Sequence, residues 1–296
     1  MRPSKAPLQF LGLGNEDTDY KKAKIVVIPA PFEASTSYQT GTINGPQAIL
    51  KASQQVEIYD IELKKSCHTV GIHTTAPLPI QKATPKEAFD ILYQQTKRVL
   101  NDGKWPIMLG GEHAVSYGMF EALLEKYPQL SIFHIDAHTD MRAAYEGDPY
   151  SHASILYRMR MKCPRTVSIG IRSMCEEEAA YVKKNKVPVY YAHEIHKNGL
   201  HPKELFSHLT DHVYLTIDVD GFSAEIIPAT GTPEPGGLKW YETLSVLKKL
   251  FKTKNVVGMD VVELMPIADF ASSDYSVAKL IFKCIGYKYY QSSSVC

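Results

Sequence analysis

Residues 130–140 read LSIFHIDAHTD, and this stretch decides the fold. Its first part, Leu130–Ile135, is a short apolar-rich run with little alternation, which is typical of a strand buried on both faces of a parallel sheet. Its second part, Asp136–Asp140, places charged side chains directly after that strand. In open parallel sheets, ligands bind beyond the carboxyl ends of the strands, so the stretch predicts a parallel sheet with a site at its edge.

The rest of the chain alternates similar runs, rich in Val and Ile, with helix-like stretches. Seven further strands are expected, at residues 24–28, 69–72, 106–109, 167–171, 189–191, 213–217 and 256–261. The helices expected between them span residues 45–53, 85–100, 114–126, 176–185, 202–209, 241–251 and 276–287. This order predicts an α/β fold, a three-layer αβα sandwich with a mainly parallel eight-stranded sheet. No repeat, charge block or linker interrupts it, so we expect one domain over residues 1–296.

The composition of the 296 residues excludes several classes of protein. Lys and Arg together number 33, and Asp and Glu 32, which leaves a net charge of +1 and argues against nucleic acid or an anionic membrane as a partner. No run approaches the ~18 consecutive apolar residues of a membrane span. The five cysteines form no Cys-x-x-Cys pair and are interpreted as thiols of a reducing compartment, so we expect a cytoplasmic protein.

Charged side chains follow three other predicted strands as well. Gly110–His113 comes after the strand at 106–109, Asp218–Gly221 after the one at 213–217, and Glu263 shortly after the one at 256–261. Because the carboxyl ends of parallel strands meet at one edge of the sheet, these groups are expected to converge. The converging side chains are His113, Asp136, His138, Asp140, Asp218, Asp220 and Glu263.

The spacing within these segments indicates metal binding. Asp136, His138 and Asp140 stand at i, i+2 and i+4, so in an extended segment they project to the same side, and Asp218 and Asp220 repeat this geometry. Four converging aspartates would repel one another strongly without cations. Two divalent ions would remove the conflict. Carboxylate-rich ligation with one imidazole for each ion suits Mn²⁺ better than Zn²⁺.

Any one of these residues alone could equally be a loop aspartate or a hydrogen-bonded histidine, but the combination favours a metal site. An EF-hand loop starting at Asp218 is excluded, because Ser223 and Ala229 stand where glycine and glutamate are required. The His193–His196 stretch is interpreted as a solvated loop or helix end, since its histidines are three residues apart instead of the four of a metalloprotease motif.

The order of these motifs resembles that of the ureohydrolases, the family of arginase, agmatinase and their relatives. The similarity extends over nearly the whole chain and rests on Gly110–His113, Asp136–Asp140, Ser151-His152, Asp218–Gly221, Gly231–Gly237 and Asp260–Glu263. The resemblance implies an arginase-like fold, in which an eight-stranded parallel sheet lies between helices. It also implies a homo-oligomer, either a trimer or a hexamer.

The resemblance further implies two Mn²⁺ per chain and a role for each site residue. One ion is expected on His113, Asp136, Asp140 and Asp218, and the other on Asp136, His138, Asp218 and Asp220, so that two aspartates bridge. A hydroxide between the ions attacks the central carbon of a guanidinium group, and the products are urea and an amine. The catalytic residues implied are His152, Glu263 and Asp140.

Two of these residues are expected to bind the substrate. Glu263 pairs with the guanidinium cation through charge-assisted hydrogen bonds and orients it. His152 lies on the loop after the Asp-x-His-x-Asp strand, and the resemblance implies that it relays a proton to the departing amine.

Agmatine, a small cationic guanidine, is the expected substrate in preference to arginine. Arginases hold the α-ammonium group of arginine with an acidic residue in a Gly-Leu-Arg-Asp-x-Asp stretch. The acidic positions of that stretch are Ser173 and Cys175 in this chain. Glu176–Glu178 would supply the missing charge after a shift in register, so arginase activity remains an alternative. Guanidinobutyrase activity is another, because the sequence does not define the far wall of the pocket.

Three other functions are weaker alternatives. A metallophosphoesterase would need Arg or Lys beside the metals, where the extra charge here is Glu263. A zinc deacetylase on a related fold would not need all of Asp140, Asp220 and His113. A non-catalytic binding subunit would be indicated by a missing metal ligand, and every ligand is present in the sequence.

Overall fold

The computed structural model describes residues 8–291, and eight strands of this range form one sheet in which each neighbouring pair is parallel. The strands in spatial order are β4 (Ile72–Thr74), β1 (Ile25–Ala30), β5 (Trp105–Gly110), β10 (Asn255–Val262), β9 (His212–Asp218), β6 (Leu130–Ile135), β7 (Thr166–Ile171) and β8 (Val189–Tyr191). The predicted α/β fold with its eight-stranded sheet is therefore confirmed.

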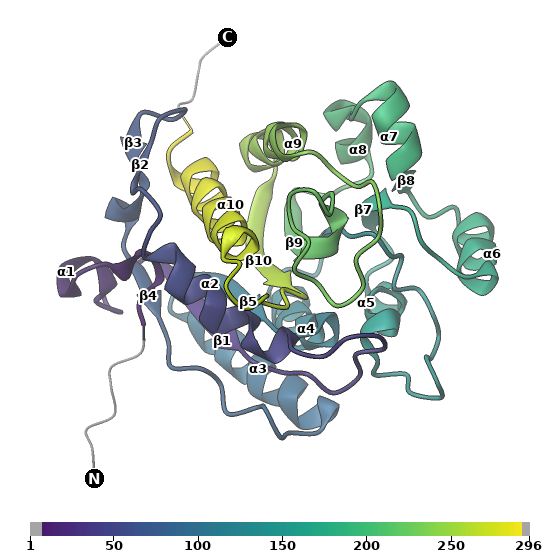
Figure 1. Cartoon of the computed structure of the whole chain (residues 1–296), viewed down its shortest axis with the longest axis horizontal. Helices are drawn as coiled ribbons and strands as arrows, with labels where there is room; N and C mark the ends of the chain where they lie inside the picture. Colours follow the sequence, from purple (N-terminus) through teal and green to yellow (C-terminus); the bar gives the residue numbers. More distant parts are fainter. Residues whose placement is uncertain (1–7, 292–296) are drawn as a thin grey trace.

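Helices cover both faces of this sheet (Figure 1). The apolar cluster on one face includes side chains of α2 (Gly45–Ser53), α7 (Ala192–Asn198), α8 (Pro202–Ser207), α9 (Trp240–Thr253) and α10 (Ser272–Tyr289). The cluster on the other face includes side chains of α3 (Pro85–Asn101), α4 (Ser116–Lys126), α5 (Ile155–Lys162) and α6 (Glu176–Asn185). The molecule thus has the three layers that the alternation of strands and helices predicts.

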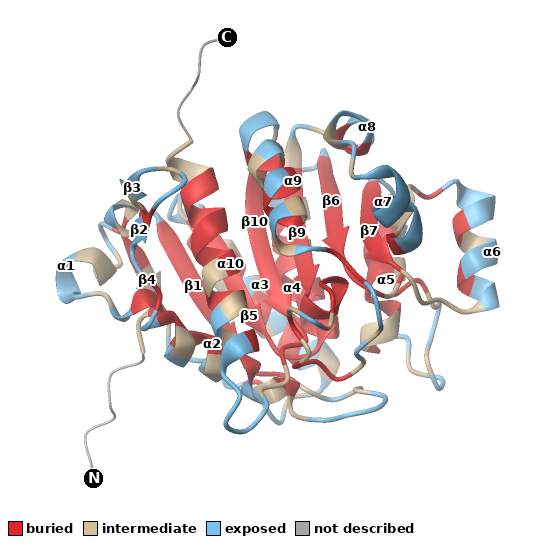
Figure 2. Cartoon of the chain, turned by 45° about the horizontal axis from the view of Figure 1, so that its top comes forward, coloured by how far each residue is buried: buried red, intermediate tan, exposed pale blue. Residues whose placement is uncertain are grey.

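The central strands are buried on both faces, as Figure 2 shows. Every residue of β1, β5, β6 and β7 is buried, which explains why these strands have few polar residues and little alternation. The helices have one buried and one exposed side. In α3, for example, Leu92 and Val99 are buried while Arg98 is exposed.

Helix α3 also begins where its sequence predicts. Thr84 accepts a hydrogen bond from the backbone N–H of Glu87, and the Glu87 carboxylate accepts the backbone N–H of Thr84. This reciprocal pair satisfies two donors that the first turn leaves unpaired. Pro85 occupies the first position of the helix, where its missing N–H costs nothing.

Some local predictions were wrong. The strand predicted at 69–72 is instead the 3₁₀ helix Cys67–Val70 followed by β4, because Gly71 turns the chain with a φ of 78° and pairing with β1 begins only at Ile72. Helix α5 was missed, and His193–His196 lies inside helix α7. The remaining elements are α1 (Asn15–Thr18), the hairpin β2 (Tyr59–Asp60) and β3 (Lys65–Ser66), and the 3₁₀ helices Phe10–Gly12, Thr42–Asn44, His113–Val115, His152–Ser154 and Val219–Gly221.

Two further expectations concern the environment of the protein. Between residues 8 and 291, the search for a helix long and apolar enough to cross a membrane finds none. The cysteines at positions 67, 163, 175 and 284 are free thiols, and Cys296 lies outside the described residues.

The strand order determines where the polar groups meet. Strands β5, β10, β9 and β6 are direct neighbours, and these are the four strands that the charged segments follow. Gly111 makes the turn after β5 possible, because its backbone passes so close to Phe32 that a Cβ atom would lie 2.0 Å from the Phe32 carbonyl oxygen. The Gly111 carbonyl also accepts the backbone N–H of Glu263 at 2.8 Å, which links the ends of β5 and β10.

We predict that Gly111→Ala destabilises the fold by about 1–3 kcal/mol or more, as overpacking a dense interior does. The added methyl group would force apart the chain ends that carry His113 and Glu263. Thermal unfolding followed by circular dichroism measures the effect. Gly14→Ala is the control, since its new Cβ would meet no atom within 4 Å, and equal melting temperatures for the two variants would contradict this account.

Candidate metal centre

The neighbouring strands deliver the predicted ligands to one buried place. His113 opens the 3₁₀ helix that follows β5, Asp136 directly follows β6, and Asp218 is the last residue of β9. Asp140 and Asp220 lie on the loops that continue from these strands. These five side chains are all buried, whereas that of His138 is 27% exposed.

His113 lies at the centre of one group of carboxylates. Its Nδ1 atom is 3.1 Å from Asp140 Oδ2, 3.2 Å from Asp136 Oδ2 and 3.5 Å from Asp218 Oδ2. This is the set of side chains that the sequence predicts for one ion. Three acceptor oxygens around a single ring nitrogen form a concave, electron-rich space that suits a cation.

His138 lies in a second group beside the first. Its Nδ1 atom is 3.0 Å from Asp220 Oδ2 and 3.6 Å from Asp136 Oδ1. Asp136 therefore contributes one oxygen to each group, which is the geometry of a bridging carboxylate. The bridging role predicted for Asp218 stays a prediction, because Asp218 contacts His113 of the first group and not His138 of the second.

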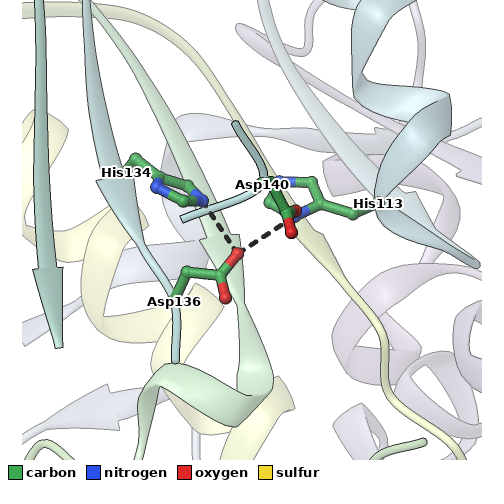
Figure 3. A group of neighbouring side chains, drawn as sticks. All are labelled: His113, His134, Asp136 and Asp140. Atoms are coloured by element: carbon green, nitrogen blue, oxygen red, sulfur yellow. Dashed lines mark hydrogen bonds and ion pairs between the residues drawn. The ribbon is translucent and has the colours of Figure 1, made fainter. Parts of the chain in front are cut away.

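One member of the cluster was missed in the sequence. His134 lies on β6 two residues before Asp136, and its Nε2 atom is 2.8 Å from Asp136 Oδ2 (Figure 3). A histidine inside an otherwise apolar strand, in phase with the Asp-x-His-x-Asp motif, was the available signal. Its other ring nitrogen is 3.1 Å from Ser168 Oγ, and this contact holds the imidazole ring in place. The fixed ring in turn orients the Asp136 carboxylate.

The contacts of His113 Nε2 determine which ring nitrogen carries the lone pair. Its Nε2 atom lies 3.0 Å from Thr216 Oγ1, and the Thr216 hydroxyl donates to Asp260 Oδ1 at 2.7 Å. Because the threonine proton is committed to Asp260, Nε2 must donate its own proton to Thr216 Oγ1. The lone pair then resides on Nδ1, which points at the carboxylates, as a metal ligand requires.

These residues fit a divalent metal ion. Nδ1 of His113 is fully buried and has no hydrogen-bond partner among residues 8–291, although a buried ring nitrogen normally has one. Burial, together with the charges of Asp220 and Asp136, raises the pKa of Asp218 well above its usual range. A cation would satisfy the nitrogen and relieve this repulsion.

The carboxylates around His138 favour the protonated form of its imidazole. Burial lowers the pKa of His138, but its hydrogen bonds to Asp136 and Asp220 outweigh this effect and raise the pKa to about 12. The protonated imidazole therefore supplies a positive charge that an ion would otherwise supply. Metal binding at this group must displace that proton.

Two site residues have unusual backbone conformations. Asp140 has a φ of 51° and Glu263 a φ of 63°, in the left-handed region that residues with side chains rarely adopt. Such strain persists only where surrounding contacts hold it, and it is common at active sites. In both cases the turned backbone directs a carboxylate toward the cluster.

A cavity of about 300 Å³ opens beside the cluster. The side chains that line it include the predicted ligands His138, Asp140 and Asp218, the predicted catalytic residues His152 and Glu263, and Ser37, Arg142, Tyr145, Ser173, Met174, Cys175, Glu178 and Thr232. The structure thus brings every predicted substrate-binding residue to the cavity. Arg142 was not singled out in the sequence, because it lies on a loop without a local motif, and Thr232 lies in the Gly231–Gly237 motif but was given no role of its own.

The sequence as a whole matches a known family. A family model described as the arginase family matches residues 23–286. The chain belongs to the arginase family. This family is metal-dependent, and the buried His/Asp cluster is the place in the described chain that could bind the metal.

Individual family members agree with this assignment. The N(1)-aminopropylagmatine ureohydrolase of Synechocystis is 41% identical over 95% of this chain and 94% of its own length. The agmatinase of Bacillus anthracis is 34% identical over 84% of this chain and 86% of its own. Among solved structures, the agmatine ureohydrolase of Thermoplasma volcanium has a TM-score of 0.86 at 29% identity, covering 96% of this chain and 94% of that one.

We predict that divalent metal stabilises the metal-stripped protein through Asp218. At a free ion concentration ~100 times the Kd, the gain in unfolding free energy is about 2.7 kcal/mol. Asp218→Asn should raise the stability of the metal-stripped protein, because it removes a buried, repelled charge, and should shrink the gain on adding metal. Thermal shift with and without Mn²⁺ measures both effects.

Asp211→Asn is the matched control, since Asp211 is exposed and lies just before the other end of the same strand. It should leave the metal effect unchanged. An Asp218→Asn variant that keeps the full stabilisation by metal would rule out Asp218 as a ligand.

Proposed function

We propose that this protein hydrolyses the guanidinium group of a small cationic guanidine to urea and an amine. The observation that carries the proposal is the position of Glu263, which lines the same cavity as Asp140 and Asp218. Glu263 is 8% exposed and has no Lys or Arg partner within residues 8–291. Burial, and then the charge of Glu112, raise its pKa well above its usual range, and a cation entering the cavity would offset both effects by pairing with the ionised carboxylate.

We propose that two Mn²⁺ occupy the cluster, one on His113, Asp136, Asp140 and Asp218 and the other on Asp136, His138, Asp218 and Asp220. The oxygen-rich donor set with one imidazole in each group supports Mn²⁺. Bound ions of this kind lower the pKa of a coordinated water and hold it as a nucleophile.

The side chains that line the cavity bind the substrate and transfer the proton. Glu263 accepts the backbone N–H of His113 at 2.6 Å through Oε1, which leaves its second oxygen for the guanidinium. That oxygen holds the planar cation with its central carbon facing the metal cluster. His152 stands on the same cavity and supplies a proton to the leaving amine. Asp140, besides binding metal, forms part of the wall against which the guanidinium lies.

We propose agmatine as the substrate in preference to arginine. Ser173 and Cys175 line the cavity where arginases have acidic residues for the α-ammonium group. Glu178 does not replace them, because it accepts hydrogen bonds from the Thr139 hydroxyl and from the backbone N–H groups of Met141 and Cys175. A buried ammonium without a partner would lose its hydration, so arginine binds poorly.

A longer amine is the second candidate substrate. The Synechocystis relative is named for N(1)-aminopropylagmatine and shares more identity with this chain than the Bacillus anthracis agmatinase does. The same guanidinium would bind Glu263, and the added aminopropyl group would extend toward the cavity mouth. A carboxylate-bearing guanidine such as guanidinobutyrate is disfavoured, since Arg142 already faces Glu178 and stacks on Tyr145.

We also propose that the protein is a cytoplasmic homo-oligomer, a trimer or hexamer, built from one domain per chain. Family membership supports the assembly, and the near-zero net charge is consistent with a small-molecule enzyme. Analytical ultracentrifugation distinguishes the assembly states.

We predict that Glu263→Gln lowers kcat/KM by about 10- to 150-fold, the equivalent of roughly 1.5–3 kcal/mol for a hydrogen bond to a charged group.

His152→Asn should lower kcat by ~10²–10⁴-fold, the usual contribution of a proton-transfer group. Both variants should retain two Mn²⁺ per chain by elemental analysis, because neither residue is a ligand. Urea release is the assay, and Glu225→Gln, an exposed glutamate, is the control.

The outcomes separate the parts of the proposal. A His152→Asn enzyme with wild-type kcat would remove the proton-transfer role. A single tightly held zinc in a fully active enzyme would contradict the two-manganese centre.

We predict that kcat/KM for agmatine or N(1)-aminopropylagmatine exceeds that for arginine and guanidinobutyrate by at least ~10-fold, since unpaired charges are rejected by a buried site. Urea release from the four substrates, measured side by side, gives the ranking. Arginine as the preferred substrate by ~10-fold would overturn the substrate assignment and leave the hydrolytic chemistry standing.

A further inference from the structure

The segment after β1 places two serines against the ring of His152. Ser35 Oγ lies 3.3 Å from His152 Nδ1, and Ser37 Oγ lies 3.5 Å from Nε2. The backbone N–H of His152 also donates to Ser35 Oγ at 3.0 Å. Ser37 lines the cavity, so the Nε2 side of the ring faces the substrate and the Nδ1 side faces away from it.

Ser35 is in turn held by a buried carboxylate. Its hydroxyl donates to Glu112 Oε1 at 2.8 Å, and Glu112 Oε2 accepts the backbone N–H groups of Ala34 and Ser35 at 2.6 and 2.7 Å. Glu112 is 1% exposed. The carboxylate therefore fixes both the backbone and the hydroxyl of Ser35, whose single proton points at Glu112.

This arrangement selects one tautomer of His152. Since the Ser35 proton is committed to Glu112, a lone pair of Ser35 Oγ faces His152 Nδ1. If Nδ1 were unprotonated, two lone pairs would oppose each other at 3.3 Å. A proton on Nδ1 removes that repulsion and makes a hydrogen bond, which leaves the lone pair of the neutral ring on Nε2.

We propose that Ser35 is a positioning residue that holds His152 in the Nδ1–H tautomer, with Nε2 directed into the cavity. The inference rests on the proposed function, in which His152 transfers a proton to the leaving amine. Nε2 accepts a proton released from the attacking water and gives it to the amine nitrogen as the C–N bond breaks, so the neutral ring is restored. With the other tautomer, Nε2 would already carry a proton and could not accept one.

Ser151 offers a competing explanation that the test must separate. Its Oγ lies 3.4 Å from the same Nδ1 atom and accepts the backbone N–H of Ala153 at 3.3 Å. Unlike Ser35, Ser151 has no carboxylate that takes its proton among the described residues, so it does not select a tautomer.

The kinetic test is a double-mutant cycle. Ser35→Ala should lower kcat by ~10-fold or more, part of the ~10²–10⁴-fold effect of losing proton transfer, with KM changed less than about twofold. In a His152→Asn background the same Ser35→Ala change should alter kcat less than about twofold, because Ser35 acts through His152. Ser35→Thr, which keeps the hydroxyl, should restore most of the activity, and Thr36→Ala, between the two serines, is the matched control.

A spectroscopic test does not require activity. In protein labelled with ¹⁵N-histidine and loaded with diamagnetic Zn²⁺, His152 should show a protonated Nδ1 and an unprotonated Nε2, with His152→Asn identifying its signals. Ser35→Ala should abolish this preference and Ser151→Ala should retain it.

Each outcome supports or overturns the proposal. An equal loss of kcat on Ser35→Ala with and without His152, or a tautomer unchanged in Ser35→Ala, would overturn the role of Ser35. If wild-type protein released no urea while the ¹⁵N spectra matched expectation, the proposed function would fail and the positioning of His152 would stand.

Discussion

The constraint on which the rest of this structure depends is the mutual repulsion of four aspartates gathered in a buried space. Two carboxylates about 4 Å apart repel by ~4 kcal/mol at an effective dielectric constant of ~20. Asp136, Asp140, Asp218 and Asp220 share such a space, and the raised pKa of Asp218 reflects it. The fold tolerates the cluster because apolar strands and covering helices supply the stability, and because positive charge completes it. Against the effect of burial, the hydrogen bonds from His138 to Asp136 and Asp220 raise the pKa of its imidazole to about 12 and favour a positive charge at this place.

The surrounding contacts keep the repelling groups in place. Thr216 and Asp260 hold the far side of the His113 ring, and His134 holds Asp136. Arg172 provides a third support, because its guanidinium donates to the backbone carbonyls of Gly170, Asp220, Phe222, Glu234 and Pro235. It thereby ties the end of β7 to the loop that carries Asp220, a predicted metal ligand, and to the loop at 231–237. Donors directed at carbonyls fix backbone geometry, and no substrate contact is needed to explain this arginine.

The cavity beside the aspartate cluster is also lined by carboxylates, among them Glu263. Glu263 has no Lys or Arg partner among the described residues, and in the proposed function it selects a cationic substrate over an anionic one. Glu263 and Asp140 both have a left-handed backbone, a strained conformation that directs their carboxylates toward the cluster. His152 lines the same cavity, and its backbone N–H donates to Ser35, whose hydroxyl donates to Glu112. The groups that contact substrate are thus supported by residues that do not.

The sequence by itself determined the parallel sheet, most helices and the six metal-binding candidates. These predictions depend on local spacing: a period of two groups Asp136, His138 and Asp140, although a left-handed backbone at Asp140 directs its carboxylate, and a buried strand needs a continuous apolar run. Only the tertiary structure decided which strand ends became neighbours, that Glu178 is already occupied, and that Ser35 meets Glu112 across 77 residues of chain. It also decided the start of β4, since a turn at Gly71 delays the pairing with β1. Contacts of this kind follow from the order of strands in space, and no periodicity in the chain encodes that order.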